Sequence, residues 1–191
     1  MTGSPIALVL GAERPFGAQI VERLRGAGFD LAADGHEGPI DVLIVNVPVR
    51  PRDIRFRDVT DDDFRAALDD QLYQVVAAGQ AAVARMTAGG SIVHVASRAH
   101  LGAWGGVQDM AAGAALVAMG RSMALELDAR GIRVNTLEAD FAGDAWETPE
   151  AQAEIAAAVA WLAGPDSAGL SGETILVNRG RSLRMAQAAK R

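Results

Sequence analysis

Short apolar runs alternate with segments of helical character along almost the whole chain, and this alternation restricts the possible folds more than any other feature. Continuous apolar runs of about five residues are typical of strands buried on both faces of a parallel sheet. The expected strands are residues 6–10, 29–33, 41–46, 91–96, 132–137 and 174–178. Helical patterns lie between them, one ending near Gly26 and Gly28 and others at about 61–86, 107–129 and 149–163. The order predicts an α/β fold with a doubly wound parallel sheet covered by helices on both faces.

Local signals support several of these boundaries. Thr60 is a suitable N-cap for the helix that begins with three aspartates, Gly131 can end the third helix, and Pro149 suits a helix start. The connection at 35–40 is too short for an ordinary parallel crossover, so the strand at 29–33 is expected to be short, displaced or absent. We expect one domain at 1–180 and a basic tail at 181–191.

Composition excludes several classes of function. The chain has no cysteine, which excludes disulfides, thiolate metal sites and cysteine nucleophiles. A net charge of −6 disfavours general nucleic-acid binding. No signal peptide and no apolar run near the length of a membrane span is evident, so a soluble, cytoplasmic protein is expected.

Five short motifs, in the right order, resemble those of the short-chain dehydrogenase/reductase family. They are residues 7–11 together with Gly17, 41–48, 90–97, 131–135 and 172–178. Each motif is weak alone, and the ordered set is specific. The resemblance implies a Rossmann-like domain.

The resemblance also places the family's four catalytic positions. Its serine falls on Ser97, its tyrosine on Met110, its lysine on Ala114 and its asparagine near Gln71. No shifted alignment restores the catalytic tyrosine and lysine, because the single tyrosine of the chain is Tyr73 and the single lysine is Lys190. In the family the tyrosine hydroxyl moves a proton to or from the substrate oxygen. The sequence therefore predicts that no catalytic centre is intact.

The cofactor loop is similarly degenerate. Of the family's NAD(P) positions, Gly11, Gly17 and Asn46 remain, and Asp34 stands where a ribose carboxylate would be. Pro15 occupies the middle glycine position and has no N–H to offer a phosphate. We expect no cofactor, with NAD(P) as a lesser alternative.

Two segments of the family pattern are missing. One gap lies between Asp34 and Asp41, where the family has its third strand and flanking helices. The other lies between Leu137 and Pro149, where it has its substrate-covering helices. The expected fold is therefore a truncated version of the family's.

The remaining polar residues give ambiguous signals. His36, His94 and His100 lack zinc-site spacing, so no metal is expected, and His94 is interpreted as a hydrogen-bonded core histidine. One basic stretch comprises Arg50, Arg52, Arg55 and Arg57. A second comprises Arg179, Arg181, Arg184, Lys190 and Arg191. Each is open to interpretation as an anion site, such as one for a coenzyme A phosphate, as an acidic-partner site, or as solvated chain.

Together these features predict a non-catalytic family member that acts as a structural or regulatory subunit. Its expected partner, in a homo- or hetero-oligomer formed through the two long central helices, is a full-length catalytic relative, by analogy one of 3-hydroxyacyl-CoA dehydrogenase type. Small residues of the second long helix suit close packing on a partner or on the chain's own sheet: Ala111, Ala112, Ala115, Ala118, Ser122 and Ala124. One alternative is a divergent NAD(P)-dependent oxidoreductase that uses Ser97 with water or His100. Another is a ligand-binding module that uses the cleft beside Gly11, Gly17 and Asn46.

Overall fold

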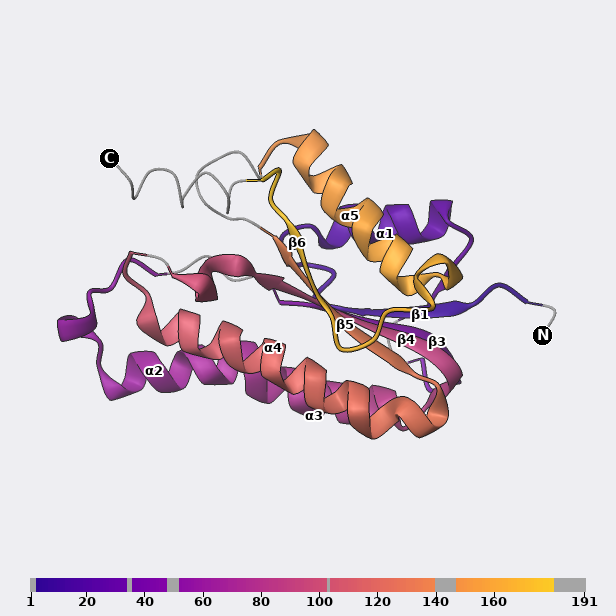
Figure 1. The fold of residues 1–191 in the computed structure, drawn as a ribbon, viewed down its shortest axis with the longest axis horizontal. Coiled ribbons are helices and arrows are strands. Elements are labelled where there is room, and N and C mark those ends of the chain that lie inside the picture. The colour runs from indigo at the N-terminus through magenta and orange to yellow at the C-terminus, as the bar shows by residue number, and fades with distance from the viewer. Residues whose placement is uncertain (1–2, 34–35, 48–51, 103, 140–146, 181–191) are drawn as a thin grey trace.

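Six parallel strands form one sheet, in the order β2-β1-β3-β4-β5-β6, in the computed structural model of the chain (Figure 1). The strands are β1 (Ile6–Leu10), β2 (Asp30–Leu31), β3 (Ile40–Asn46), β4 (Met86–Ser97), β5 (Arg133–Ala139) and β6 (Thr174–Val177). The structure describes residues 3–33, 36–47, 52–102, 104–139 and 147–180. The expected Rossmann-like α/β architecture is confirmed.

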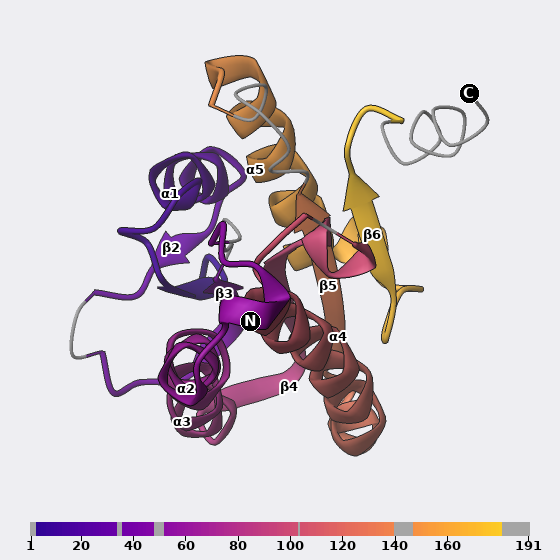
Figure 2. The ribbon, with the colours of Figure 1, turned by 90° about the vertical axis from the view of Figure 1, so that its left-hand side faces the viewer.

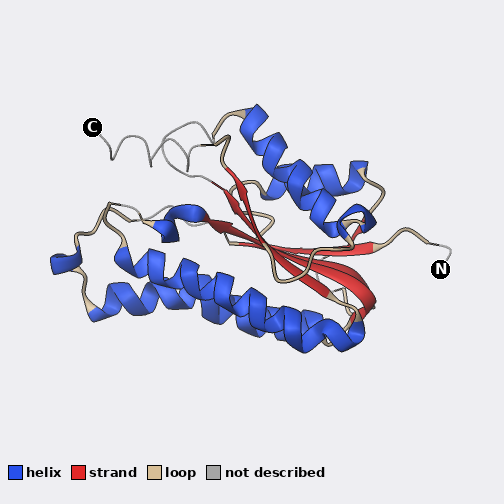
Figure 3. Cartoon of the chain, viewed as in Figure 1, coloured by secondary structure: helices blue, strands red, loops and turns tan. Residues whose placement is uncertain are grey.

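Helices cover both faces of the sheet (Figures 2 and 3). On one face lie α1 (Gly17–Gly26) and α5 (Pro149–Ala163), and on the other α2 (Asp61–Leu68), α3 (Gln74–Val83) and α4 (Val107–Leu127). Each face has its own apolar core. Ile20 and Val159 pack against the first face, and Leu116 packs against the second. Burial of these side chains, at about 25 cal/mol per Å² of apolar surface, fixes the helices on the sheet.

The length of β2 explains how the short connection at 35–40 is possible. β2 pairs with β1 only through Asp30 and Leu31, beside the first two residues of β1. The chain therefore leaves β2 near the amino ends of the strands and does not have to return from their carboxyl ends. The strand expected at 29–33 is present but short. β2 is an edge strand of the sheet, and within the described residues no further strand pairs with its free edge. This is expected if the family's third strand is missing.

The helix expected over 61–86 is divided and ends earlier. A π-helical segment at Asp69–Tyr73 separates α2 from α3, and α3 ends at Val83. Met86 already belongs to β4, where it pairs with Ile40. The start of the helix is as expected: Thr60 forms a capping box with Asp63.

Helix α4 is more apolar than the sequence analysis allowed. Residues 107–130 are long and apolar enough, by length and composition alone, to cross a membrane. In the structure α4 lies on the sheet, where Ala112, Leu116 and Gly120 are buried. Its apolar character therefore serves packing on the sheet and, on its other side, leaves apolar residues such as Leu125 exposed.

Candidate functional site

The loop after β1 is held by the side chain of Asn46. The Asn46 amide donates hydrogen bonds to the carbonyl oxygens of Gly11, at 2.8 Å, and Pro15, at 2.9 Å. Gly11 has a φ of 79°, and a Cβ there would collide with the Asn46 carbonyl. A Cβ on Gly17 would collide with the backbone of Ala12. The structure thus brings Gly11, Gly17 and Asn46 together, and each has a structural reason to be there.

This loop does not form the cradle that a dinucleotide phosphate requires. Pro15 offers no N–H at the point where the family has a glycine. The cleft beside Gly11 has a volume of about 120 Å³, and its charged lining residues are Glu13, Asp70 and Arg14. Pockets for cofactors and other small ligands span roughly 300–1,000 Å³. The residues present therefore do not fit NAD(P), and Asp34 lies outside the described residues.

Three of the four catalytic positions meet around one very small cavity. Gln71, Ser97 and Met110 line a space of about 10 Å³, too small for a substrate. Ser97 ends β4, and its Oγ accepts a hydrogen bond of 3.2 Å from the N–H of Ala99. Ala114 is exposed one turn further along α4. No ionisable hydroxyl or ammonium stands at the positions of the family's tyrosine and lysine.

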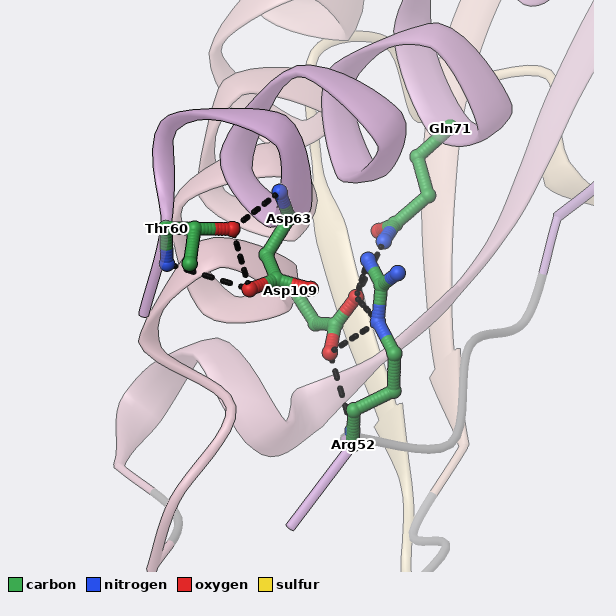
Figure 4. Close-up of polar contacts among 5 residues, drawn as sticks. All are labelled: Arg52, Thr60, Asp63, Gln71 and Asp109. Carbon is green, nitrogen blue, oxygen red and sulfur yellow. Dashed lines mark hydrogen bonds and ion pairs between the residues drawn. The ribbon is translucent and has the colours of Figure 1, made fainter. Parts of the chain in front are cut away.

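An ion pair joins the partly exposed Arg52 to the buried Asp109 (Figure 4), and Asp109 also lines this cavity. Arg52 Nη2 lies 2.9 Å from Asp109 Oδ1, and the Arg52 backbone N–H donates to Asp109 Oδ2, also at 2.9 Å. Gln71 Nε2 donates to Asp109 Oδ1 at 3.1 Å. The Asp109 side chain is 1% exposed, and its hydrogen bond raises the pKa of Arg52. The position of the family's asparagine is thus used to satisfy a buried carboxylate.

The sequence analysis did not single out Asp109. The sequence feature that could have identified Asp109 is an acidic residue in an otherwise apolar stretch of α4, directly before Met110. A charge at such a position needs a partner when it is buried. Nothing in the sequence identified that partner as Arg52, which lies 57 residues away in a loop.

The basic stretch around Arg52 is occupied by contacts within the chain. The Arg55 guanidinium lies 4.6 Å from the centroid of the Trp104 ring, and Arg57 lies 3.5 Å from Asp58. The carbonyl of Ile54 accepts a hydrogen bond from Gly106 at 3.0 Å. The interpretation as solvated chain is therefore wrong for Arg52, whose charge is paired with Asp109. The interpretations of the stretch as an anion site or an acidic-partner site stay predictions. Arg50 lies outside the described residues.

The second basic stretch is described only at its start. Arg179 forms two hydrogen bonds with Glu154 of α5, at 2.8 and 2.7 Å. This exposed ion pair connects the segment after β6 to α5. Arg181, Arg184, Lys190 and Arg191 lie outside the described residues.

His100 and Glu138 form a pair on the other side of Ser97. His100 Nδ1 lies 3.1 Å from Glu138 Oε1, at the carboxyl ends of β4 and β5, close enough for an ion pair but without the alignment of a hydrogen bond. Burial raises the pKa of Glu138, and the charges of His100, Arg121 and Arg98 oppose this rise. His100 also lines the cavity that Ser97 lines. Sequence reasoning considered His100 and missed Glu138, whose signal was an acidic residue within a buried strand.

The two other histidines belong to neither pair. His36 is in an exposed loop beside the carbonyl of Pro39. His94 is buried in β4, as expected, but its Nδ1 has no hydrogen-bond partner, contrary to expectation. Among the described residues no group of three or more potential ligands is arranged to hold a metal ion.

Comparison with known proteins identifies a consistent set of relatives. The family model described as enoyl-(acyl carrier protein) reductase matches residues 22–150. Dehydrogenase/reductase SDR family member 4 of Oryctolagus cuniculus is 30% identical, over 86% of this chain and 70% of that protein. The 3-oxoacyl-[acyl-carrier-protein] reductase FabG of Vibrio harveyi is 29% identical, over 75% of this chain and 67% of that protein. The chain thus spans about two thirds of the length of these relatives.

The structural comparison agrees with the sequence comparison. A short-chain dehydrogenase/reductase from Serratia marcescens superposes with a TM-score of 0.81 at 27% identity, covering 93% of this chain and 97% of that one. A blue fluorescent protein from a metagenomic library, solved with NADPH, superposes with a TM-score of 0.78 at 24% identity. The second likeness concerns the fold alone.

Proposed function

Because the chain belongs to the short-chain dehydrogenase/reductase family of oxidoreductases, we propose that it is a non-catalytic subunit that supports a catalytic relative. The observation that carries this proposal is Met110 at the tyrosine position, beside a cavity of about 10 Å³. Asp109, which lines the same cavity, is engaged in an ion pair with Arg52. A substrate carbonyl would therefore find no room in this cavity and no proton donor at the position of the family's tyrosine.

The chemistry of hydride transfer supports the same conclusion. Reduction of a carbonyl requires a group that delivers a proton to the oxygen. The thioether of Met110 has no exchangeable proton, and Ala114 has no charge to lower the pKa of a neighbouring hydroxyl. We propose further that NAD(P) is not a working cofactor here, because Pro15 and the small cleft beside Gly11 do not suit a pyrophosphate.

The surface of α4 supports a role in assembly. Ala112 and Ala124 are buried against the sheet, while Ala111, Ala118 and Ser122 are exposed on the outer side. Leu125, on the same helix, is 82% exposed. Small side chains allow a second helix to approach closely, and an exposed leucine gains by burial. We propose that α3 and α4 contact the corresponding helices of a full-length, cytoplasmic relative.

The similarity to a 3-oxoacyl-[acyl-carrier-protein] reductase suggests the substrate class of such a complex. A partner that acts on acyl thioesters, of 3-hydroxyacyl-CoA or acyl-carrier-protein type, agrees with this relative and with the matching family model. The identity of the acyl carrier belongs to the partner, because this chain offers no described anion site for it.

The test is a comparison of the chain alone with the chain co-expressed with a full-length relative from the same genome. Alone, it should bind neither NADH nor NADPH at millimolar concentration in calorimetry and should oxidise neither with acyl-thioester ketones. With the relative, native mass spectrometry should show a mixed oligomer, and Leu125→Glu should abolish it. Reductase activity of the chain alone, or strict separation of the two proteins, would overturn the proposal.

A second candidate is a divergent oxidoreductase that uses Ser97 and His100. The favouring observation is that His100 is held 3.1 Å from the buried Glu138 and lines the same cavity as Ser97. A histidine beside a carboxylate is a suitable proton donor or acceptor. NADH or NADPH oxidation that is lost in both Ser97→Ala and His100→Gln, but retained in Ser122→Ala, would establish it over the first proposal.

A further inference from the structure

A short helical segment, η3 (Arg98–Leu101), follows β4 directly and forms one wall of the cavity beside Ser97. His100 of η3 lines this cavity together with Met110 of α4. η3 packs against the same helix, since a Cβ placed on Gly113 would lie 3.7 Å from the Cβ of His100. The position of η3 therefore helps to set the size of the cavity, which is about 10 Å³.

The backbone hydrogen bonds of η3 are local. The N–H of Ala99 donates to Ser97 Oγ at 3.2 Å, and the N–H of Gly102 donates to the Ala99 carbonyl at 2.9 Å. These two bonds lie within the segment and do not fasten it to the rest of the sheet. Gly102, with a φ of 127°, ends the segment in a conformation that residues with a side chain rarely adopt. Glycine has several backbone conformations of similar energy, so the chain can change direction at this residue.

The pair of His100 and Glu138 joins η3 to β5. Nδ1 of His100 lies 3.1 Å from Oε1 of Glu138, and the two side chains are 14% and 1% exposed. Oε1 of Glu138 has no hydrogen-bond partner, so its contact with the imidazole is electrostatic. A buried carboxylate is unfavourable without a cation close to it. The strength of this connection therefore depends on the charges of both side chains.

Both charges change with pH. The imidazole is the side chain that ordinarily changes its charge near neutrality. When it loses its proton, Glu138 is left as a buried carboxylate beside a neutral ring. At lower pH the carboxyl is protonated instead, and the imidazolium is no longer attracted to it. Burial raises the pKa of Glu138, so this second change begins nearer to neutrality than it would for an exposed glutamate.

The other charged groups around the pair do not titrate near neutrality. Arg98 of η3 and Arg121 of α4 both favour the ionised form of Glu138. A guanidinium keeps its charge throughout the physiological range. Asp109 of α4 lines the same cavity, but its charge is paired with Arg52 at 2.9 Å. Among the described residues around Glu138, the imidazole is thus the cation whose charge changes.

We propose that His100 and Glu138 form a pH-sensitive switch that holds η3 against β5 only while the imidazole is protonated and the carboxylate is ionised. Outside that range η3 is released and the cavity beside Ser97 opens to solvent. The switch operates whether or not the chain is catalytic, so it does not rest on the proposed function.

The test follows η3 with a single ¹⁹F label as the pH is changed. The chain contains no cysteine, so Leu101→Cys, at a position that is 60% exposed, allows one label to be attached to η3 alone. The ratio of released to held η3 in the ¹⁹F spectrum should be lowest at an intermediate pH and should rise about tenfold on either side of it. The rise at higher pH should coincide with the loss of the His100 proton, followed by the ring ¹H signals. The same label on Ala81→Cys, at an exposed position of α3, should show neither change.

Three variants assign the two changes to their residues. Glu138→Gln should remove both, because no carboxylate remains to attract the imidazolium. His100→Gln should remove the change near neutrality, while His36→Gln, in an exposed loop, should leave both in place. A wild-type η3 signal that is constant with pH would overturn the proposal, even if a variant does not fold. Changes that persist in Glu138→Gln, or that appear equally at the α3 label, would also overturn it.

Discussion

Asp109 is a buried carboxylate whose charge depends on one guanidinium. Arg52→Met would keep the apolar stem of the side chain and remove its charge, leaving Asp109 with the Gln71 amide and one backbone N–H. Breaking a buried pair costs about 3–5 kcal/mol, but the Arg52 side chain is 37% exposed, so we expect a smaller loss of about 2 kcal/mol in the free energy of unfolding. Urea denaturation would measure it.

Arg57→Met is the matched control for that measurement. Arg57 and Asp58 form an ion pair whose side chains are 86% and 59% exposed. Exposed pairs contribute about 0–1 kcal/mol, so this variant should hardly change the urea midpoint. Equal effects of the two substitutions would show that the pair of Arg52 with Asp109 is not structurally important.

His94 predicts how stability depends on pH. Its pKa is about 4 in the folded protein and about 6.5 in the unfolded chain. Between pH 4 and pH 6.5 the unfolded chain binds more protons at His94 than the folded protein does. The free energy of unfolding should therefore be highest above pH 6.5 and should decrease as the pH falls toward 4. The loss should reach about 3 kcal/mol at pH 4. His94→Asn should remove this part of the dependence, measured as the difference from wild type in urea titrations at pH 4–7. A constant difference across that range would contradict the prediction.

At the scale of elements, the sequence predicted those parts of the fold that depend on local signals. The apolar runs, the Thr60 cap and the Pro149 start all act within a few residues of their own position. The end of α3 and the length of β2 depend instead on which neighbouring strand each segment meets, as Met86 shows by pairing with Ile40. The site was predictable only where a single residue sufficed, as at Met110. Pairs such as Arg52 with Asp109 were not, because their partners are distant in sequence.

The start of α2 is a case in which the local signal can be measured directly. Asp63 donates its backbone N–H to Thr60 Oγ1 at 3.1 Å, and Thr60 donates its own N–H to the Asp63 carboxylate at 3.0 Å. Thr60→Ala removes the first bond, and loss of an N-cap typically costs about 1 kcal/mol. Thr60→Ser should retain most of the stability in the same urea experiment. A loss as large for serine as for alanine would show that the hydroxyl is not what stabilises the helix.

At the scale of the whole molecule, several separate changes act against the same chemistry. Pro15 stands at the middle glycine position of the loop after β1, Met110 and Ala114 stand at the positions of the proton-transfer pair, and Asp109, paired with Arg52, lines the cavity beside Met110. The sheet and both helical layers are nevertheless complete enough to match a full family member over 93% of this chain. A complete fold with an altered site is what we expect if the chain is retained for its surface. The residues that form the surface and the core differ from those that form the site, so the site can change while the fold stays the same.

This view predicts that restoring the two lost catalytic side chains will not restore catalysis. Met110→Tyr with Ala114→Lys would supply the hydroxyl and the ammonium, but a larger side chain at residue 110 would not enlarge a cavity that is only about 10 Å³ with Met110 in place. Pro15 would still stand at the position of the family's glycine. We expect no oxidation of NADH or NADPH above background with acyl-thioester ketones, in a protein whose circular dichroism matches the wild type. Adding Arg52→Ala and Pro15→Gly to the pair should be the first combination to show measurable cofactor binding. Turnover by the double variant alone would mean that the loop and the ion pair never blocked the site, and that only the tyrosine and lysine separate this chain from an active enzyme.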